Sequence, residues 1–295
     1  MTRSIAAIIF LGACLGVSSL PAPGEDLPKE PDLRVVGPAS TRQLLIGLVR
    51  AMKENKGLNV AIIADATSDQ ALDAVANGKV GIGLMTKPLT GEDRAQYPDA
   101  PLVVIPIGME AVAIGVAGDI WEAGVHTITK ENMRAVYERK ITNWKDVGGP
   151  DEKITFFNFE QGHGVWEIFA EWLYGDNRKA PIPKVEMVAT NEDARDTIEF
   201  TPGSVVPVEA AFIDGMRYHA LGVDLPKDIG TPTAADVASK IYPIVRPLIA
   251  VVVGRPSLAV RAATEYLTGP AGQALARKTG ILGLDAVPKP SPPAY

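Results

Sequence analysis

The chain has 295 residues, of which 46% are hydrophobic and 22% are charged, a balance typical of a folded globular protein rather than a disordered one. Its formal charge is −6 and its pI is near 5.2. This acidic balance, with no run of basic residues, excludes nucleic acid as an expected partner. A chain of this length can bury a large core and is expected to form two lobes.

Residues 1–24 have the pattern of a signal peptide, with Arg3 as the basic start and Ile5–Val17 as an apolar run too short for an ordinary membrane span. Two processing routes remain open. Cleavage after Gly24 would give a periplasmic or secreted protein, and lipidation of Cys14 would give a lipoprotein. We favour cleavage, because Cys14 falls early and the apolar run continues past it. Cleavage would also remove the only cysteine, and with it any disulfide or thiolate metal site.

Short apolar runs then alternate with helical patterns. The expected elements are a strand at 33–36, a helix at 41–55, a strand at 58–63, a helix at 68–76 and a strand at 80–85. This βαβα order predicts an α/β fold, with a sheet whose strands are joined by crossover helices.

Two long apolar runs follow, and both are expected to cross between the lobes. Leu102–Val116 is interrupted by Pro106 and Gly108 and could be two strands, whereas Ile241–Val253 suits a return crossing. We therefore expect a discontinuous first lobe (25–109 and 247–295) and a second lobe (110–246), which close on a ligand by a hinge motion.

A glycine-containing loop is the most informative local feature. The apolar run Ile154–Phe159 leads into Glu160–Gly164, and Val165–Leu173 follows with helical spacing of its apolar residues. A loop at a helix N-terminus directs unpaired N–H groups and partial positive charge outward, which suits an anion. The alternative is an ordinary strand-to-helix turn. Further helices are expected at 129–137, where Thr129 is the N-cap candidate, and at 257–267 and 269–278.

Five segments, taken in order, resemble the phosphate-binding proteins of ABC transporters. They are Asn77–Leu89 (NGKVGIGLMTKPL), Ile141–Gly149 (ITNWKDVGG) with the loop and helix after it, Thr201–Val208 (TPGSVVPV), Tyr242–Val252 (YPIVRPLIAVV) and Gly272–Gly280 (GQALARKTG). Each segment alone is modest, but five in the same order are specific for a fold.

This resemblance implies a two-lobed type II periplasmic binding protein with a hinge of two crossing strands. It implies a secreted, monomeric solute-binding protein that captures a small anion, either phosphate or a related oxyanion or organic acid, for an ABC transporter membrane complex. No cofactor or metal is expected. The three histidines lie in separate segments, and neither a metalloprotease motif nor a nucleophile elbow is present, so we do not expect an enzyme.

Ligands of open α/β sheets bind where strands end and helices begin, and four such loops supply the candidate ligand-binding residues. They are Ser40, Thr41 and Arg42; Thr67 and Ser68; Thr86 and Lys87; and Gly162, His163 and Gly164. The hydroxyls could instead cap helices, and Lys87 could be an ordinary surface lysine.

The fourth loop departs from the family's R-x-x-x-S-G-T-x-x-x-F pattern. Phe159 stands in place of the arginine, His163 in place of the serine and Val165 in place of the threonine. The family's charged clamp and two of its hydroxyl donors therefore do not carry over, and only Gly164 matches the pattern cleanly. Gly81 also replaces an acid of the family. Removing one partner of a buried charge pair costs on the order of 3–5 kcal/mol, so an anion needs a replacement cation.

Arg42, Lys87 and His163 are the candidates for that cation. A cationic His163 would make anion binding strengthen as the pH falls from about 8 to 5, whereas a neutral, hydrogen-bonded histidine would not. The missing clamp also leaves a second function open, in which a degenerate binding-protein fold serves as a periplasmic interaction or sensor module. Ligand-induced stabilisation distinguishes the two functions.

Overall fold

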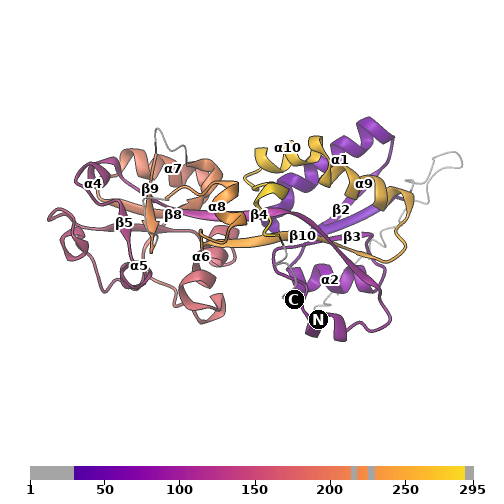
Figure 1. The fold of residues 1–295 in the computed structure, drawn as a ribbon, viewed down its shortest axis with the longest axis horizontal. Helices are drawn as coiled ribbons and strands as arrows, with labels where there is room; N and C mark the ends of the chain where they lie inside the picture. Colours follow the sequence, from indigo (N-terminus) through magenta and orange to yellow (C-terminus); the bar gives the residue numbers. More distant parts are fainter. Residues whose placement is uncertain (1–29, 214–217, 225–229, 290–295) are drawn as a thin grey trace, which may run out of the picture. The chain divides into compact units, whose positions relative to one another are not determined.

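The computed structural model describes residues 30–213, 218–224 and 230–289. The predicted signal peptide and its two processing routes, including Cys14, lie outside the described residues. Within them, strands and helices alternate along the chain (Figure 1), which confirms the predicted α/β class. None of the helices in this part of the chain is long and apolar enough to cross a membrane.

The first half of the sheet has the strand order β2-β1-β3-β10. It consists of β1 (Leu33–Gly37), β2 (Val60–Asp65), β3 (Ile82–Met85) and β10 (Val245–Val253). β1 pairs in parallel with β2 and β3, and β10 is antiparallel to β3. The connections are α1 (Arg42–Lys56) and α2 (Ser68–Ala76), so the predicted βαβα unit is confirmed.

Helices cover both faces of these strands. α1, α9 (Leu258–Thr268) and α10 (Pro270–Lys278) lie on one face and α2 on the other (Figure 1). Because successive side chains of a strand point to opposite faces, Val35 joins the core under α1 and Val36 joins the core under α2. The carboxyl ends of β1, β2 and β3 are thereby fixed side by side.

β4 (Leu102–Val116) is one strand of 15 residues, so the prediction that it divides in two was wrong. Ile107 has no partner between Pro106, opposite Ile249, and Gly108, opposite Leu248. This bulge carries the strand past the proline, which cannot donate a ladder hydrogen bond. A Cβ on Gly108 would lie 2.1 Å from the carbonyl oxygen of Leu282, so the glycine serves close packing rather than a chain break.

The second half of the sheet is joined to the end of β4. Residues 112–116 of β4 pair with β8 (Ser204–Glu209), and residues 114–116 pair with β9 (His219–Val223). Beyond these strands lie β5 (Thr127–Ile128), β6 (Thr155–Asn158) and β7 (Glu186–Met187). The helices of this half are α4 (Gly118–Glu122), α5 (Lys130–Tyr137), α6 (Gly164–Tyr174), α7 (Asn191–Phe200) and α8 (Ala234–Ala238), and α3 (Gly91–Ala95) precedes β4.

The described hydrophobic cores follow this division of the sheet. Two clusters draw on residues 33–107 and 248–281, one on each face of the first half. A third and larger cluster runs from Met109 to Ile244 and includes Ala286. The lobe boundaries expected from the sequence, 25–109 with 247–295 and 110–246, remain a prediction.

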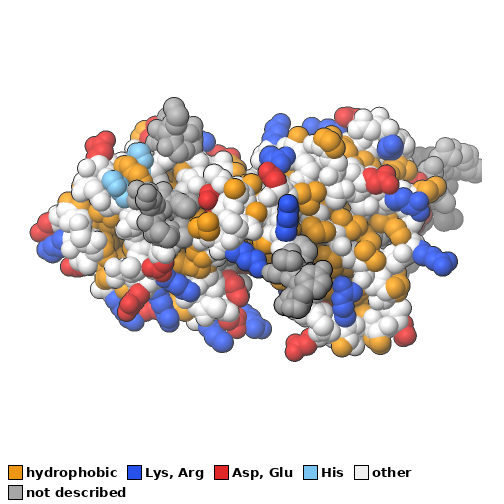
Figure 2. Space-filling model, viewed as in Figure 1, with side chains coloured by type: hydrophobic (Ala, Val, Ile, Leu, Met, Phe, Trp, Pro, Cys, Tyr) orange, Lys and Arg blue, Asp and Glu red, His pale blue; other side chains and the backbone are white. Residues whose placement is uncertain are grey.

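Charged side chains of both signs are interspersed over the face of the molecule shown in Figure 2. An anion would therefore be held by local donors rather than by a broad basic surface.

Candidate functional site

A cavity of about 590 Å³ gathers the carboxyl ends of three strands. Ser40 follows β1, the loop Gly162–Gly164 follows β6, and Glu209 ends β8; all of them line the cavity. Four predicted residues, Ser40, Gly162, His163 and Gly164, are thus brought together from segments more than 120 positions apart. This is the place where open α/β sheets hold ligands.

Arg246 of β10 lies next to Ser40 and Gly164. Its Nη2 donates to Ser40 Oγ at 3.2 Å. A Cβ on Gly164 would lie 3.0 Å from that same Nη2 and 3.0 Å from Ser40 Cβ. The guanidinium therefore stands where the loop after β1 meets the start of α6.

Two carboxylates hold this guanidinium in place. Arg246 Nε donates to Glu110 at 2.5 Å and Nη1 donates to Glu167 at 2.7 Å. The side chains of Arg246 and Glu110 are 13% and 5% exposed, whereas that of Glu167 is 35% exposed. Burial alone would lower the pKa of Arg246, but the charges of the two carboxylates outweigh burial and raise it. The site therefore contains a permanent cation that is already paired.

His163 is the N-cap of α6. Its Nδ1 accepts the backbone N–H of Val165 at 3.3 Å, and its ring stacks on Phe159 with the centroids 4.2 Å apart. Burial, and then the charge of Arg246, lower the pKa of His163. The lowered pKa and the capping Nδ1 favour the alternative of a neutral, hydrogen-bonded histidine, and the cationic role of His163 stays an untested prediction.

The loop after β1 folds as a 3₁₀ turn, Ala39–Thr41, ahead of α1. Thr41 is buried, and its hydroxyl donates to the carbonyl of Pro38 at 2.8 Å. Neither Ser40 nor Thr41 caps α1 through its side chain, so that alternative was wrong. Of the two hydroxyls, the one on Ser40 is in the cavity and the one on Thr41 serves the turn.

The second predicted loop has a structural role. Thr67 caps α2 in a reciprocal capping box with Gln70, and Ser68 Oγ accepts the backbone N–H of Thr86 at 3.0 Å. Arg42 forms an ion pair with Asp65 at the end of β2. These residues do not line the cavity that contains Ser40.

Lys87 in the third loop is also engaged. Its Nζ lies 2.5 Å from Asp69 and 3.1 Å from Asp93. Thr86, beside it, is buried and bonded to Ser68. Two of the three proposed cations, Arg42 and Lys87, are thus paired with carboxylates away from the cavity.

Glu209 is an acid whose charge state the fold changes. Burial, and then the charge of Glu110, raise the pKa of Glu209 to about 8. Its backbone N–H donates to Asn191 Oδ1 at 2.9 Å. The raised pKa favours the protonated carboxyl at neutral pH, a form that can donate a hydrogen bond to a ligand in the cavity.

Arg246 and Glu110 are the residues that sequence reasoning missed, although a signal was present. Each is the only charged residue in one of the two long apolar runs, Ile241–Val253 and Leu102–Val116. A charge inside a buried strand requires a partner, so opposite charges in two runs that are both expected to cross between the lobes point to each other. Arg246 also stands within the YPIVRPL segment that carries the family resemblance.

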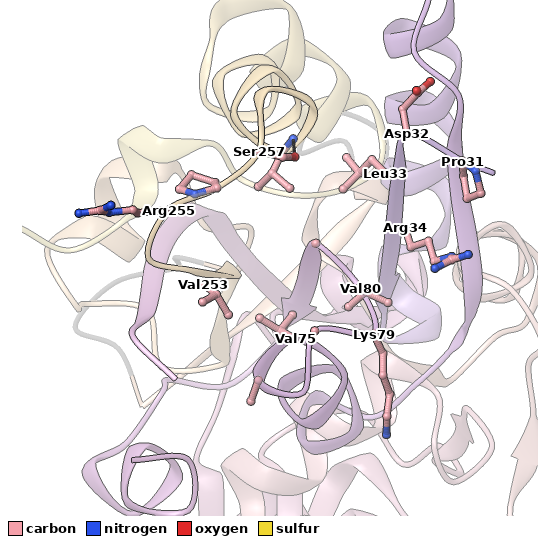
Figure 3. Close-up of a pocket in the computed structure, with 15 residues that line it drawn as sticks. Pro31, Asp32, Leu33, Arg34, Val75, Lys79, Val80, Val253, Arg255 and Ser257 are labelled. Atoms are coloured by element: carbon pink, nitrogen blue, oxygen red, sulfur yellow. Dashed lines mark hydrogen bonds between the residues drawn. The ribbon is translucent and has the colours of Figure 1, made fainter. Parts of the chain in front are cut away.

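A second cavity, of about 420 Å³, lies at the amino ends of β1 and β3 (Figure 3). Leu33, Val80 and Val253 line it, while Lys79 and Arg255 extend away from its centre. No predicted site residue lines it. It lies at the amino ends of these strands, whereas open α/β sheets bind ligands at the carboxyl ends. Among the described residues, no three His, Cys, Asp or Glu side chains form a group that could hold a metal ion.

The chain is similar to known proteins in both sequence and fold. The model of the PBP superfamily domain matches residues 31–270. The phosphate-binding protein PstS of Bacillus subtilis is 26% identical over 217 residues, which are 72% of this chain and 67% of that protein. PstS of Borreliella burgdorferi is 25% identical over 169 residues, which are 55% of this chain and 60% of that protein. The chain thus aligns with roughly two thirds of these curated relatives.

Solved structures cover more of the chain. An ABC-type phosphate transport receptor from Vibrio cholerae has a TM-score of 0.69 at 18% identity, covering 85% of this chain and 99% of that one. PstS from Borrelia burgdorferi has a TM-score of 0.67 at 22% identity, covering 85% and 98%. The predicted fold, a two-lobed type II periplasmic binding protein, and the predicted resemblance to phosphate-binding proteins are confirmed. Since the family model spans well over half of its length, the chain belongs to the PBP superfamily.

Proposed function

We propose that this chain is a solute-binding protein that captures a small oxyanion, phosphate first among them, for an ABC importer. The anion would lie in the cavity lined by Ser40 and the Gly162–Gly164 loop, with Arg246 as its cation. The names of the relatives support phosphate as the ligand.

The observation that carries this proposal is the contact of Arg246 with Ser40, beside Gly164. It brings a guanidinium, a hydroxyl and a helix N-terminus to one point, and each of these groups favours an oxyanion. Arg246 would thereby supply a guanidinium to a site that lacks an arginine at the position of Phe159.

Phosphate-dependent unfolding tests the proposal. Residues 25–295, freed of phosphate by dialysis, should unfold at a higher temperature with phosphate than with buffer alone. A ligand at a hundredfold excess over Kd adds about 2.7 kcal/mol of stability. Sulfate, molybdate, phosphonates and carboxylates in parallel would identify the ligand class.

Arg246→Gln should abolish this shift, because the amide has neither the charge nor the paired donors of a guanidinium. Arg261→Gln, on α9 and away from the cavity, is the matched control and should keep it. A phosphate shift that persists in Arg246→Gln would exclude the proposed site.

One observation favours a second function, that of an interaction or sensor module. Arg246 is already paired with Glu110 and Glu167, as expected for a clamp that no longer receives a ligand. In that case none of the anions would change the unfolding temperature, and a protein partner would be sought instead.

Location and partners follow from the same proposal. We propose an extracytoplasmic protein, secreted or lipid-anchored through Cys14, that acts as a monomer and docks on the membrane complex of an importer. Mass analysis of the processed chain would separate cleavage after Gly24 from lipidation. We propose no catalytic role and no cofactor.

A further inference from the structure

We propose that Glu167 is a built-in competitor for the anion site: its carboxylate occupies the place on Arg246 that a bound oxyanion needs, and it thereby sets the affinity. This inference rests on the proposed function, since it concerns the same site.

The contacts of Arg246 show which partner can be exchanged. Glu110 is 5% exposed and pairs with Nε, whereas Glu167 is 35% exposed and pairs with Nη1. Leaving Arg246 would strand the Glu110 carboxylate in the core, which is very unfavourable. The Glu167 carboxylate can turn into water instead. Glu110 is therefore the permanent counter-ion, and Glu167 is the displaceable one.

Glu167 also competes for the helix terminus. It lies in the first turn of α6, the helix that begins at Gly164. The unpaired N–H groups and the dipole that would attract an oxyanion there stabilise an acidic side chain in the same way. One carboxylate is thus bonded to the guanidinium and also lies in the first turn of the helix whose N-terminus would attract the anion.

The sequence position of Glu167 also supports its role as a competitor. The loop and helix pattern of the resembled family leaves the position of Glu167 unconstrained, between Val165 and Phe169. At this unconstrained position this chain carries an acid, which lies where its other residues hold a cation. An arriving phosphate must displace the acid and then remain beside it, and both requirements weaken binding.

The test compares Glu167→Gln with the wild type by titration calorimetry with inorganic phosphate at pH 7.5. The amide keeps the size of the side chain but removes its charge, so we expect the Kd for phosphate to fall at least tenfold. Glu160→Gln is the matched control: it removes the same charge from an exposed residue of the preceding loop and should change Kd less than twofold.

The outcomes separate the two proposals. Tighter binding in Glu167→Gln, including binding that appears only in this variant, supports the competitor. Equal or weaker binding than in a phosphate-binding wild type overturns the competitor and leaves the proposed function standing. No binding by either protein overturns both.

A second readout guards against a variant that is merely misfolded. Without phosphate, Glu167→Ala should unfold at a lower temperature than the wild type, because Arg246 loses a partner. With saturating phosphate the difference should vanish or reverse, because the anion takes the vacated place. A constant difference with and without phosphate would mean that Glu167 is a structural partner only.

Discussion

Burial changes the charge states of the titratable side chains around Ser40. His163 has a lowered pKa and caps its helix through an unprotonated Nδ1. Glu209 has a raised pKa, which favours its protonated form at neutral pH. Arg246 stays charged because Glu110 and Glu167 surround it. The positive charge of the site therefore comes from the guanidinium, and anion binding should not gain strength from His163 as the pH falls.

Glu209 makes the stability of the fold depend on pH. In the unfolded chain its pKa is near the ordinary 4.5, and in the folded protein it is about 8. A raised pKa means that the protonated form stabilises the fold; this contribution is complete below about pH 4.5 and is lost as the pH rises through about 8. One pKa unit corresponds to about 1.4 kcal/mol.

We therefore expect Glu209→Gln to be more stable than the wild type at pH 9, by roughly 1–4 kcal/mol, and close to it at pH 5. Urea unfolding at both pH values measures the difference. Glu186→Gln, an exposed residue of β7, is the control and should follow the wild type. A Glu209→Gln variant whose advantage does not grow with pH would show that this acid titrates normally.

The candidate site is built at the N-terminus of a helix. The N-termini of the helices differ in how closely the rest of the chain packs against them. Gly164 and Gly118 are the first residues of α6 and α4. A Cβ on Gly164 would meet Arg246 and Ser40 at 3.0 Å, whereas a Cβ on Gly118 would meet nothing within 4 Å. Ser40 Cβ is fixed to its backbone and Arg246 is held by two carboxylates, so neither can easily give way.

Gly164→Ala should therefore weaken phosphate binding about tenfold, which corresponds to about 1.4 kcal/mol. Gly118→Ala should leave it unchanged. Titration calorimetry measures both affinities, and circular dichroism checks that α6 still forms. Unchanged affinity in Gly164→Ala would mean that Arg246 can move aside and that the contact is not a tight one.

Most of the longer elements were predictable from local pattern, and the exceptions have physical reasons. Thr129 caps α5 through the backbone N–H of Asn132, as its residue type indicated. The division of β4 was wrong because a bulge accommodates Pro106. α7 was missed because only Ala194 and Ile198 of its ten residues are buried, so its apolar periodicity is too sparse to reveal a helix.

At the scale of the whole molecule, β4 and β10 connect the two halves of the sheet, and Arg246 and Glu110 are paired across them. We propose that these strands are the hinge between the predicted lobes. Phosphate in the cavity that Ser40 and Gly164 line together would contact both predicted lobes and so favour a closed arrangement.

Small-angle scattering of residues 25–295 should then show a smaller radius of gyration with phosphate than without it. Arg246→Gln should show no change on adding phosphate, because the anion loses its cation. A radius of gyration that phosphate leaves unaltered in a protein shown to bind it would argue against the hinge.

The sequence by itself determined the α/β class, the order of the first elements, the family resemblance and two of the candidate loops, those with Ser40 and with Gly162–Gly164, which line the cavity. These depend on periodicity, turn residues and short motifs, which are properties of neighbouring positions. The tertiary structure decided which cation serves the site and which candidates have other partners. Arg246 is 206 positions from Ser40 and 136 from Glu110. The partners and the burial of a charged side chain depend on chain segments that only folding brings together. Whether that side chain is available to a ligand therefore cannot be read from its neighbours in the sequence.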